Sequence, residues 1–327
     1  MKLGIIGAGG IVQEFIPKLR NIHGLEILGV QGTKRSKEKV EELCAKHEIA
    51  HAVDSFDALC ALGIDTVYIA VPNHLHFTYC KQALEKGLHV IVEKPMTSNL
   101  KEALILKQLA EEKQLFLFEA ITTLYLDNFH TIEKWLPRIG TVKLVQSQFS
   151  QYSRRYDAFL AGEVLPVFDP EKSGGAMMDL NLYNLHLIMG LFGKPEKIQY
   201  YANLEKGIDT NGMLIMQYEH FTALALAAKD SKGISGAVLQ GTKGCIKTDS
   251  CANAIGKVTL ELNDGTIEER ESRNMSDRMI PEFEAFIQAI SEGNLAFCYE
   301  MLDKSIAVCE VQTDARMSAG IIFPADR

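Results

Sequence analysis

Short apolar runs alternate with amphipathic stretches over the first third of the chain. The apolar runs have the length of buried strands, and they cover residues 3–7, 25–30, 65–71, 88–92 and 115–118. Between them, apolar positions recur with helical spacing in residues 11–22, 36–47, 74–86 and 100–113. Strands that alternate with helices of this length indicate βαβ units and a parallel sheet covered on both faces. We therefore predict an α/β domain with a doubly wound parallel sheet over residues 1–120.

The spacing of apolar residues changes after Glu119. Longer strand-like runs, separated by turn residues, then cover residues 141–152, 197–204, 211–218, 221–229, 235–248 and 257–271. Helical spacing returns at about 174–192, 281–291 and 299–318. This pattern of long strand-like runs, turn residues and a few helices predicts an α+β domain with a large, mostly antiparallel open sheet over residues 121–327. An arrangement in which the C-terminal segment packs back on the first domain stays open.

A glycine-rich turn joins the first predicted strand to the first predicted helix. Gly7 permits a tight turn, and Gly9 lets the backbone approach a pyrophosphate without a Cβ in the way. The helix that begins here offers free N–H groups and partial positive charge to phosphates. The full GxGxxG fingerprint is broken, because Val12 stands at its third glycine. Its place in the first βα turn still favours a Rossmann dinucleotide site, with Gly7, Gly9, Gly10 and Ile11 as contacts, over a turn without a ligand.

The end of the second predicted strand carries cations where an acid would bind the ribose of NAD. An Asp or Glu is usual about 20 residues beyond the glycine turn in NAD enzymes. Here the chain has Lys34 and Arg35 instead. A 2′-phosphate suits such a site, and the guanidinium fork makes Arg35 the better candidate. We predict NADP as the cofactor; NAD, with both cations merely beginning a solvated helix, is the alternative.

Composition narrows the class of partner. The formal net charge of -8 and the pI near 5.7 argue against nucleic acid or an anionic membrane as the main partner. No apolar run is long enough to cross a bilayer. The seven cysteines are scattered without a CxxC pair, which argues against a disulfide framework or a zinc site. We expect a cytoplasmic protein with reduced thiols, no metal and a small polar substrate.

Polar residues follow two further strands of the predicted sheet. Pro72, Asn73 and His76 come after the third strong strand, and Glu93 and Lys94 come after the fourth. Open α/β sheets bind ligands at the carboxyl ends of their strands, so we predict cofactor contacts here. No third metal ligand accompanies the histidines of this segment. The alternatives are a solvated loop lysine at Lys94 and a simple ion-pair partner at Glu93.

One predicted helix carries a polar stripe between apolar rows. At about 100° per residue, Asp179, Tyr183 and His186 fall on one line of the helix that follows Gly175. Such a line is expected at a partly buried cleft, where shifted pKa values suit acid–base chemistry. The alternative is a buried hydrogen-bonded cluster that only pins the helix.

The order of these motifs resembles the Gfo/Idh/MocA oxidoreductase family, which includes glucose-fructose oxidoreductase, inositol dehydrogenases and dihydrodiol dehydrogenases. The resemblance covers essentially the whole chain. Its most specific parts are Glu93-Lys94-Pro95 and the Gly-Gly-Ala-Met-Met-Asp run at 174–179, with Glu119 in support as a further cofactor contact. In this family the lysine of the first motif reaches toward the reacting hydroxyl, and the peptide before its proline is commonly cis.

The resemblance also implies roles in the second domain. Tyr183 becomes the proton donor or acceptor, Asp179 orients it or the substrate, and Lys94 assists. His186 and Tyr125 become further substrate contacts. A proton relay is the alternative role of His186. Asn181 replaces a glycine that is usual in the family motif, which weakens any assignment of the substrate by analogy.

We therefore predict hydride transfer between a nicotinamide cofactor and a secondary alcohol or carbonyl of a sugar, cyclitol or diol. The alternatives are a reductase of imines or other unsaturated bonds with the same cofactor, and a sensor or regulator that binds NAD(P) without catalysis. The resemblance implies a homodimer or homotetramer formed through the C-terminal sheet. The alternating run at 221–229 is compatible with a buried sheet face.

Overall fold

The protein is described by a computed structural model that covers residues 1–19, 22–273 and 275–327. It forms two compact units, one of residues 1–120 and 279–303, the other of residues 121–278 and 304–327. No helix in the described ranges is both long enough and apolar enough to cross a membrane.

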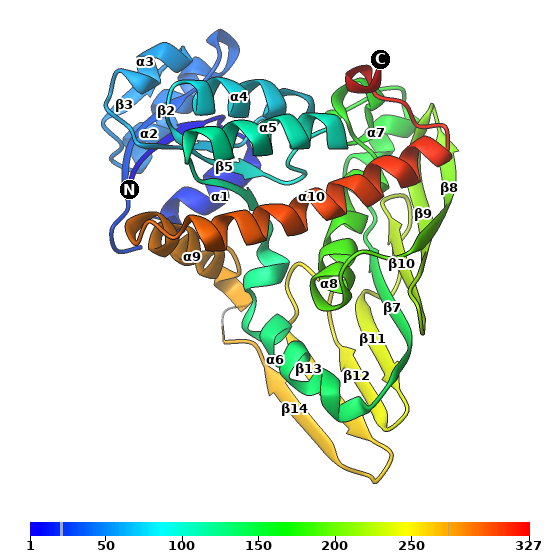
Figure 1. Ribbon diagram of the computed structural model, residues 1–327. Helices are drawn as coiled ribbons and strands as arrows, with labels where there is room; N and C mark the ends of the chain where they lie inside the picture. The colour runs from blue at the N-terminus through cyan, green and yellow to red at the C-terminus, as the bar shows by residue number, and fades with distance from the viewer. Residues whose placement is uncertain (20–21, 274) are drawn as a thin grey trace. The chain divides into compact units, whose positions relative to one another are not determined.

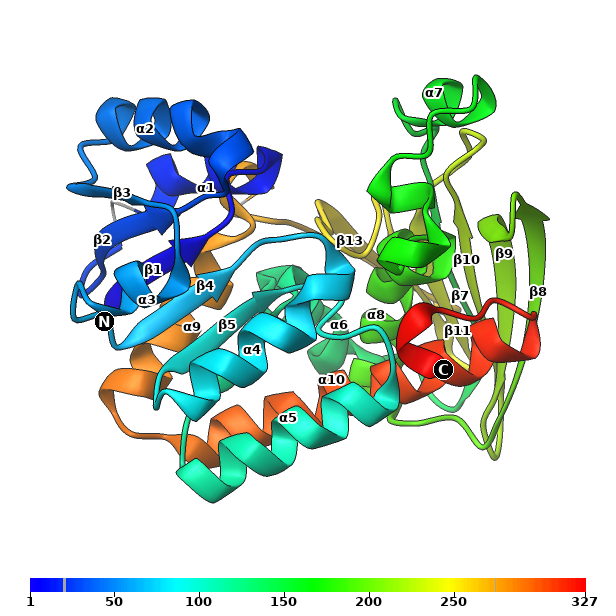
Figure 2. The same ribbon diagram turned by 90° about the horizontal axis from the view of Figure 1, so that it is seen from above.

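The first unit is built on a six-stranded parallel sheet with the order β3-β2-β1-β4-β5-β6. Its strands are β1 (Lys2–Ile6), β2 (Glu26–Gln31), β3 (His51–Val53), β4 (Thr66–Ile69), β5 (His89–Glu93) and β6 (Leu117–Ala120). Its helices are α1 (Gly10–Leu19), α2 (Lys37–Lys46), α3 (Phe56–Cys60), α4 (His76–Glu85), α5 (Leu100–Lys113) and α9 (Ile280–Ser291). The predicted doubly wound sheet is confirmed, and the order reverses between β1 and β4. Figure 2 shows β1, β4 and β5 side by side in this sheet, where they run in the same direction.

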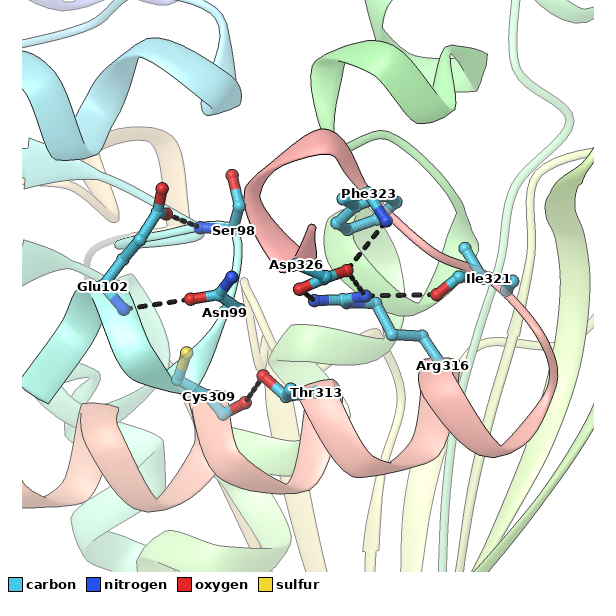
Figure 3. A network of polar contacts seen from close by, with 9 residues as sticks. All are labelled: Ser98, Asn99, Glu102, Cys309, Thr313, Arg316, Ile321, Phe323 and Asp326. Atoms are coloured by element: carbon cyan, nitrogen blue, oxygen red, sulfur yellow. Dashed lines mark hydrogen bonds and ion pairs between the residues drawn. The ribbon is translucent and has the colours of Figure 1, made fainter.

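Local sequence explains the limits of these elements. Asn99 caps the start of helix α5, because its side chain accepts a hydrogen bond from the Glu102 backbone at 2.9 Å. The Glu102 carboxylate in turn accepts from the Ser98 backbone at 3.0 Å, which completes a reciprocal cap (Figure 3). Neither β3 nor α3 is predicted from the sequence, because segments of three and five residues are too short to show a period.

Helix α9 corrects the predicted extent of the second domain. Residues 279–303 belong to the first unit instead of to an unbroken domain over 121–327. The physical reason is aromatic packing: the Phe283 ring lies 4.4 Å from that of Phe15 and 5.4 Å from that of Tyr68. Phe286 stacks on Phe118 at 4.4 Å. These rings complete the core of the first unit.

The second unit is built on an eight-stranded sheet with the order β14-β13-β12-β11-β7-β10-β9-β8. All neighbours in this sheet are antiparallel except β7 and β10, so the predicted mostly antiparallel sheet is confirmed. Its strands are β7 (Val142–Ser150), β8 (Lys197–Glu205), β9 (Ile208–Gln217), β10 (Thr222–Ala228), β11 (Gly236–Gly241), β12 (Gly244–Thr248), β13 (Lys257–Leu262) and β14 (Ile267–Glu271). Figure 1 shows β14 at the edge of this sheet.

The helices of this unit are α6 (Asp127–Trp135), α7 (Tyr156–Leu160), α8 (Leu182–Phe192) and the last part of α10 (Leu295–Ser318). A buried ion pair joins the end of α10 to the C-terminal segment of the chain. The guanidinium of Arg316, only 1% exposed, donates to both carboxylate oxygens of Asp326 at 2.6 and 2.8 Å (Figure 3). It also donates to the Ile321 carbonyl at 3.1 Å and lies 4.1 Å from the Phe323 ring centre. With three partners, this buried charge is well compensated.

Alanines on β10 let a helix approach the inner face of the sheet closely. Ala223, Ala225 and Ala227 are buried there, and α8 packs over β7 and β10. Asn181 donates to the Ala225 carbonyl at 3.3 Å, and Asn184 donates to the Leu226 carbonyl at 2.9 Å. The asparagine that departs from the family motif therefore serves as a bridge between helix and sheet.

Candidate active site

The glycine turn of the first unit has room for a ligand at two of its three glycines. Gly7 has a φ of +113°, and a Cβ there would lie 2.2 Å from the Ala70 carbonyl oxygen, so the fold itself requires this glycine. At Gly9 and Gly10 a Cβ would meet nothing within 4 Å. Open space beside the backbone at the start of α1 fits the approach of a pyrophosphate. Val12, at the third glycine of the fingerprint, is fully buried in the core.

The two cations after β2 are exposed. Lys34 and Arg35 begin a short 3-10 helix, Lys34–Ser36. The turn before it is closed by Ser36, whose hydroxyl accepts from the Thr33 backbone at 2.8 Å. Neither cation forms an ion pair within the part of the chain that the structure describes. Both charges are therefore available to an anion from solution.

His76 contacts the backbone of the turn that carries Lys94. This histidine is fully buried, with Nδ1 2.8 Å from the Pro95 carbonyl oxygen and Nε2 2.9 Å from the Val71 carbonyl oxygen. Burial lowers the pKa of His76, and the two carbonyls together with Glu119 oppose that shift. His76 thus ties the end of β4 to the turn after β5, by way of backbone oxygens.

Two acids hold the same turn. Glu119 is buried at the end of β6 and accepts from the Met96 backbone at 2.9 Å. Glu93 accepts a hydrogen bond from the Tyr68 hydroxyl. The Lys94–Pro95 peptide is cis, as the family resemblance implied. Pro72 and Asn73 lie at the end of β4, before α4, and Lys94 is half-buried.

In the second unit, Asp179 lies on a π-helical turn that is anchored to the sheet. The predicted helix over 174–192 is interrupted: Met177–Asn181 is a π-helix, and α8 follows it. The Met177 backbone donates to Asp209 at 2.7 Å, and so does the Tyr200 hydroxyl. Burial raises the pKa of Asp209 to about 6, and these two donors partly offset the shift. Single π-turns occur often at functional sites.

The π-turn changes the predicted polar stripe, which assumed about 100° per residue throughout. Asp179 is 27% exposed at its side chain, whereas Tyr183 is 9% and His186 is 1% exposed. The Tyr183 ring lies 6.0 Å from that of Phe149. Tyr125 is half-buried at the end of the 3-10 helix Thr122–Tyr125.

A buried lysine that was not predicted from the sequence pairs with Asp179. Lys229 is 1% exposed, and its Nζ lies 2.9 Å from Asp179 Oδ2. The same ammonium donates to the Val167 carbonyl at 2.7 Å and lies 4.6 Å from the Phe168 ring centre. One signal was available in the sequence. Lys229 follows Ala227 by two positions, and alternate residues of a strand point to the same face. Strand alternation therefore places Lys229 on the face of the sheet that the inward alanines of β10 share.

Asp179 and Lys229 line a polar cavity of about 290 Å³ in the second unit. The other lining residues are Gln151, Ser153, Arg154, Arg155 and Leu180. A carboxylate held by a buried ammonium, at the wall of such a cavity, can accept a hydrogen bond from a hydroxyl group. No cluster of three or more metal-ligating side chains occurs in the residues described.

Comparison with known proteins places these features in a family. Residues 1–120 match the model described as an oxidoreductase family with an NAD-binding Rossmann fold, and residues 137–247 match the GFO/IDH/MocA C-terminal domain. The chain is 34% identical to scyllo-inositol 2-dehydrogenase (NADP(+)) of Bacillus subtilis, over 100% of this chain and 99% of the relative. The chain belongs to the Gfo/Idh/MocA family. It is an NAD(P)-dependent oxidoreductase of that family.

Two further proteins resemble the chain over most of its length. D-xylose 1-dehydrogenase (NADP(+)) 2 of Haloferax volcanii is 28% identical, over 90% of each chain. Among solved structures, a 3-ketoreductase from Actinomadura kijaniata in complex with NADP and TDP-benzene has a TM-score of 0.85 and 19% identity, and each chain is covered to 97%. At that identity the likeness supports the fold alone.

Proposed function

We propose that this protein is an NADP-dependent dehydrogenase or reductase for a secondary alcohol or carbonyl of a sugar, cyclitol or diol. The observation that carries the proposal is Asp179, paired with buried Lys229 at the wall of a polar cavity. A neutral apolar substrate would give this pair nothing to bind, whereas a polyol offers hydroxyl groups to the carboxylate. Two relatives named above act on scyllo-inositol and D-xylose, which supports this substrate class.

The chain has to bind the substrate oxygen and donate or accept one proton at that atom. Tyr183 is our candidate for the proton donor or acceptor, and Lys94 for the cation that stabilises charge on the oxygen. Asp179, held by Lys229, orients the substrate hydroxyls. His186 and Tyr125 are further candidate substrate contacts. When bound, the nicotinamide supplies the hydride donor or acceptor, which is the difficult part of the chemistry.

The cofactor proposal rests on charge at the end of β2. Lys34 and Arg35 are exposed cations without an ion-pair partner in the described residues, which suits a 2′-phosphate. The relative from Bacillus subtilis is named as an NADP(+) enzyme, which supports the same choice. The remaining proposed cofactor contacts lie along the same edge of the sheet: Gly7, Gly9, Gly10, Ile11, Pro72, Asn73, Glu93, Lys94 and Glu119. His76 joins them through its bonds to the backbone around Lys94.

Calorimetry with NADPH and NADH, followed by a screen of polyols and aldoses with the preferred cofactor, tests the proposal. We expect NADPH to bind more tightly, and Arg35→Ala to remove about tenfold or more of that preference, because a charge-assisted bond to phosphate is lost. Turnover is expected with at least one polyol or its carbonyl form. Equal or tighter binding of NADH would refute the NADP assignment. Turnover confined to imines would replace the proposed substrate class with the imine-reductase alternative.

We also propose that the outer face of the second sheet joins copies of this chain into a homodimer or homotetramer. Met213 is 49% and Ile215 is 37% exposed on β9, and Tyr201 beside Met213 is 55% exposed on β8. Leu224 and Leu226 of β10 lie opposite Ile215 and Met213 on the same face. Together they form a contiguous apolar patch on a sheet, which is typical of an interaction surface.

Met213→Glu is expected to convert the oligomer into monomers, because it places a charge at the centre of this patch. Light scattering coupled to size-exclusion chromatography measures the mass directly. Ile267→Glu, at an apolar residue that is 65% exposed on β14, is the matched control and should leave the mass unchanged. A wild-type protein that is already monomeric at micromolar concentration would contradict the proposal.

A further inference from the structure

The polar cavity of the second unit has more positive than negative charge. Its lining includes three cations, Lys229, Arg154 and Arg155, and one acid, Asp179. The Lys229 ammonium is engaged by Asp179 at 2.9 Å, which leaves two guanidinium groups uncompensated in the lining. The whole chain carries a formal net charge of -8. A local excess of positive charge on an acidic protein is a specific feature of this cavity.

Both arginines are exposed and available to a ligand. Neither Arg154 nor Arg155 forms an ion pair or a side-chain hydrogen bond within the residues that the structure describes. The nearby acids Asp157 and Glu205 accept instead from tyrosine hydroxyls, at 2.6 Å in each case. The two guanidinium groups therefore face the cavity and solvent without a protein partner.

The turn that carries them is fixed to the sheet. The Ser153 backbone donates to the Lys229 carbonyl at 2.8 Å, and the Gln151 backbone donates to the Ala228 carbonyl at 2.9 Å. On the other side of the arginines, the buried Tyr156 ring stacks on Phe159 at 6.1 Å. The backbone on both sides of the arginines is thus held, which limits the entropy lost when a ligand binds.

The residue type and the size of the cavity define the ligand. A guanidinium presents a planar fork that matches the oxygens of a phosphate or carboxylate. The volume of about 290 Å³ lies just below the range of roughly 300–1,000 Å³ that is usual for ligand sites. It suits one ring with a small anionic substituent better than a dinucleotide-sized molecule.

We propose that the substrate is an anionic polyol: a single sugar or cyclitol unit with a phosphate or carboxylate group that Arg154 and Arg155 bind. Asp179 and its partner Lys229 bind hydroxyl groups of the same molecule. This inference rests on the proposed function and narrows its substrate class. The binding of the anionic group does not depend on hydride transfer, so the two can be tested separately.

The kinetic test compares a neutral hexose or inositol with its monophosphate and with its carboxylate analogue. We expect kcat/KM for an anionic form to exceed that for the neutral form by about tenfold or more, mainly through KM, because a charge-assisted bond is added. Replacing both arginines, Arg154→Gln with Arg155→Gln, should remove this advantage, so that kcat/KM becomes similar for the anionic and the neutral form. Lys143→Gln, at an exposed cation of β7 outside the cavity lining, is the matched control. Equal kcat/KM for neutral and anionic forms, or an advantage that survives the double variant, would overturn the inference.

The binding test uses calorimetry with the sugar monophosphate and the carboxylate in the presence of NADPH, and it needs no turnover. Binding that the double arginine variant weakens by about tenfold or more supports the anionic subsite even if hydride transfer is absent, in which case the proposed function fails alone. Turnover of neutral polyols without preferential binding of either anion refutes the subsite and leaves the proposed function standing. A preference between the two anions identifies the group that the arginines bind.

Discussion

Lys94→Ala is expected to lower kcat/KM by about three orders of magnitude while the Kd for NADPH stays nearly unchanged. General acid–base groups contribute roughly 10²- to 10⁴-fold, and Lys94 is the proposed cation at the substrate oxygen. The backbone on which it stands is held by His76, Glu93 and Glu119, so removal of the side chain should leave the turn in place. Initial rates followed by nicotinamide absorbance give kcat/KM, and calorimetry gives the Kd.

Lys101→Ala is the matched control for this variant. Lys101 is an exposed lysine in the first turn of α5, in the same unit, and its loss should not affect turnover. Tyr183→Phe removes only a hydroxyl group and should reduce kcat/KM comparably to Lys94→Ala if Tyr183 moves the proton. A Lys94→Ala protein that keeps a tenth or more of wild-type kcat/KM would exclude the proposed role of this lysine.

Lys229→Met is expected to lower kcat/KM by about 100-fold, although Lys229 itself is buried behind Asp179. Its ammonium holds the Asp179 carboxylate at 2.9 Å and is held in turn by the Val167 carbonyl. Without it, Asp179 loses the partner that fixes its orientation at the cavity wall. We therefore class Lys229 as a positioning residue.

A double-mutant cycle with Asp179→Asn separates this role from a general effect on folding. If Lys229 acts through Asp179, the double variant should be no less active than Asp179→Asn alone, because residues in one network are not additive. Lys206→Met is the matched control: that lysine also donates to a backbone carbonyl, of Phe159, and lies 4.4 Å from the ring centre of the same residue. Losses that simply multiply in the double variant would refute the positioning role.

Much of the first unit could be predicted because its signals are local. The predicted helix over 100–113 coincides with α5, whose cap is built from Ser98, Asn99 and Glu102 within one turn of chain. The glycine turn was recognised for the same reason, since a strand, a tight turn and a helix follow one another directly in the sequence. Gly7 is required by the close approach of Ala70, whereas the open space at Gly9 and Gly10 is where we propose that the cofactor binds.

For the second unit, the sequence predicts the fold class but not the local structure around Asp179. Its alternating strand-like runs could be predicted, because alternation and turn chemistry are local properties. The π-turn at Met177–Asn181 was not, because it depends on a bond from the Met177 backbone to Asp209 on another strand. The stripe of Asp179, Tyr183 and His186 was calculated for a continuous α-helix, whereas Asp179 lies on the π-turn and the other two residues lie on α8.

The sequence by itself determined the doubly wound sheet, the mostly antiparallel second sheet, the nicotinamide dinucleotide family and the position of Lys94 on a turn after a strand. Only the tertiary structure decided that Lys229 is the partner of Asp179, that Arg154 and Arg155 line the same cavity, and that α9 completes the core of the first unit. The reason is sequence separation. Periodicity reports which face of an element is buried, but the choice of partner is made between segments far apart in the chain, where packing and charge compensation act only after folding.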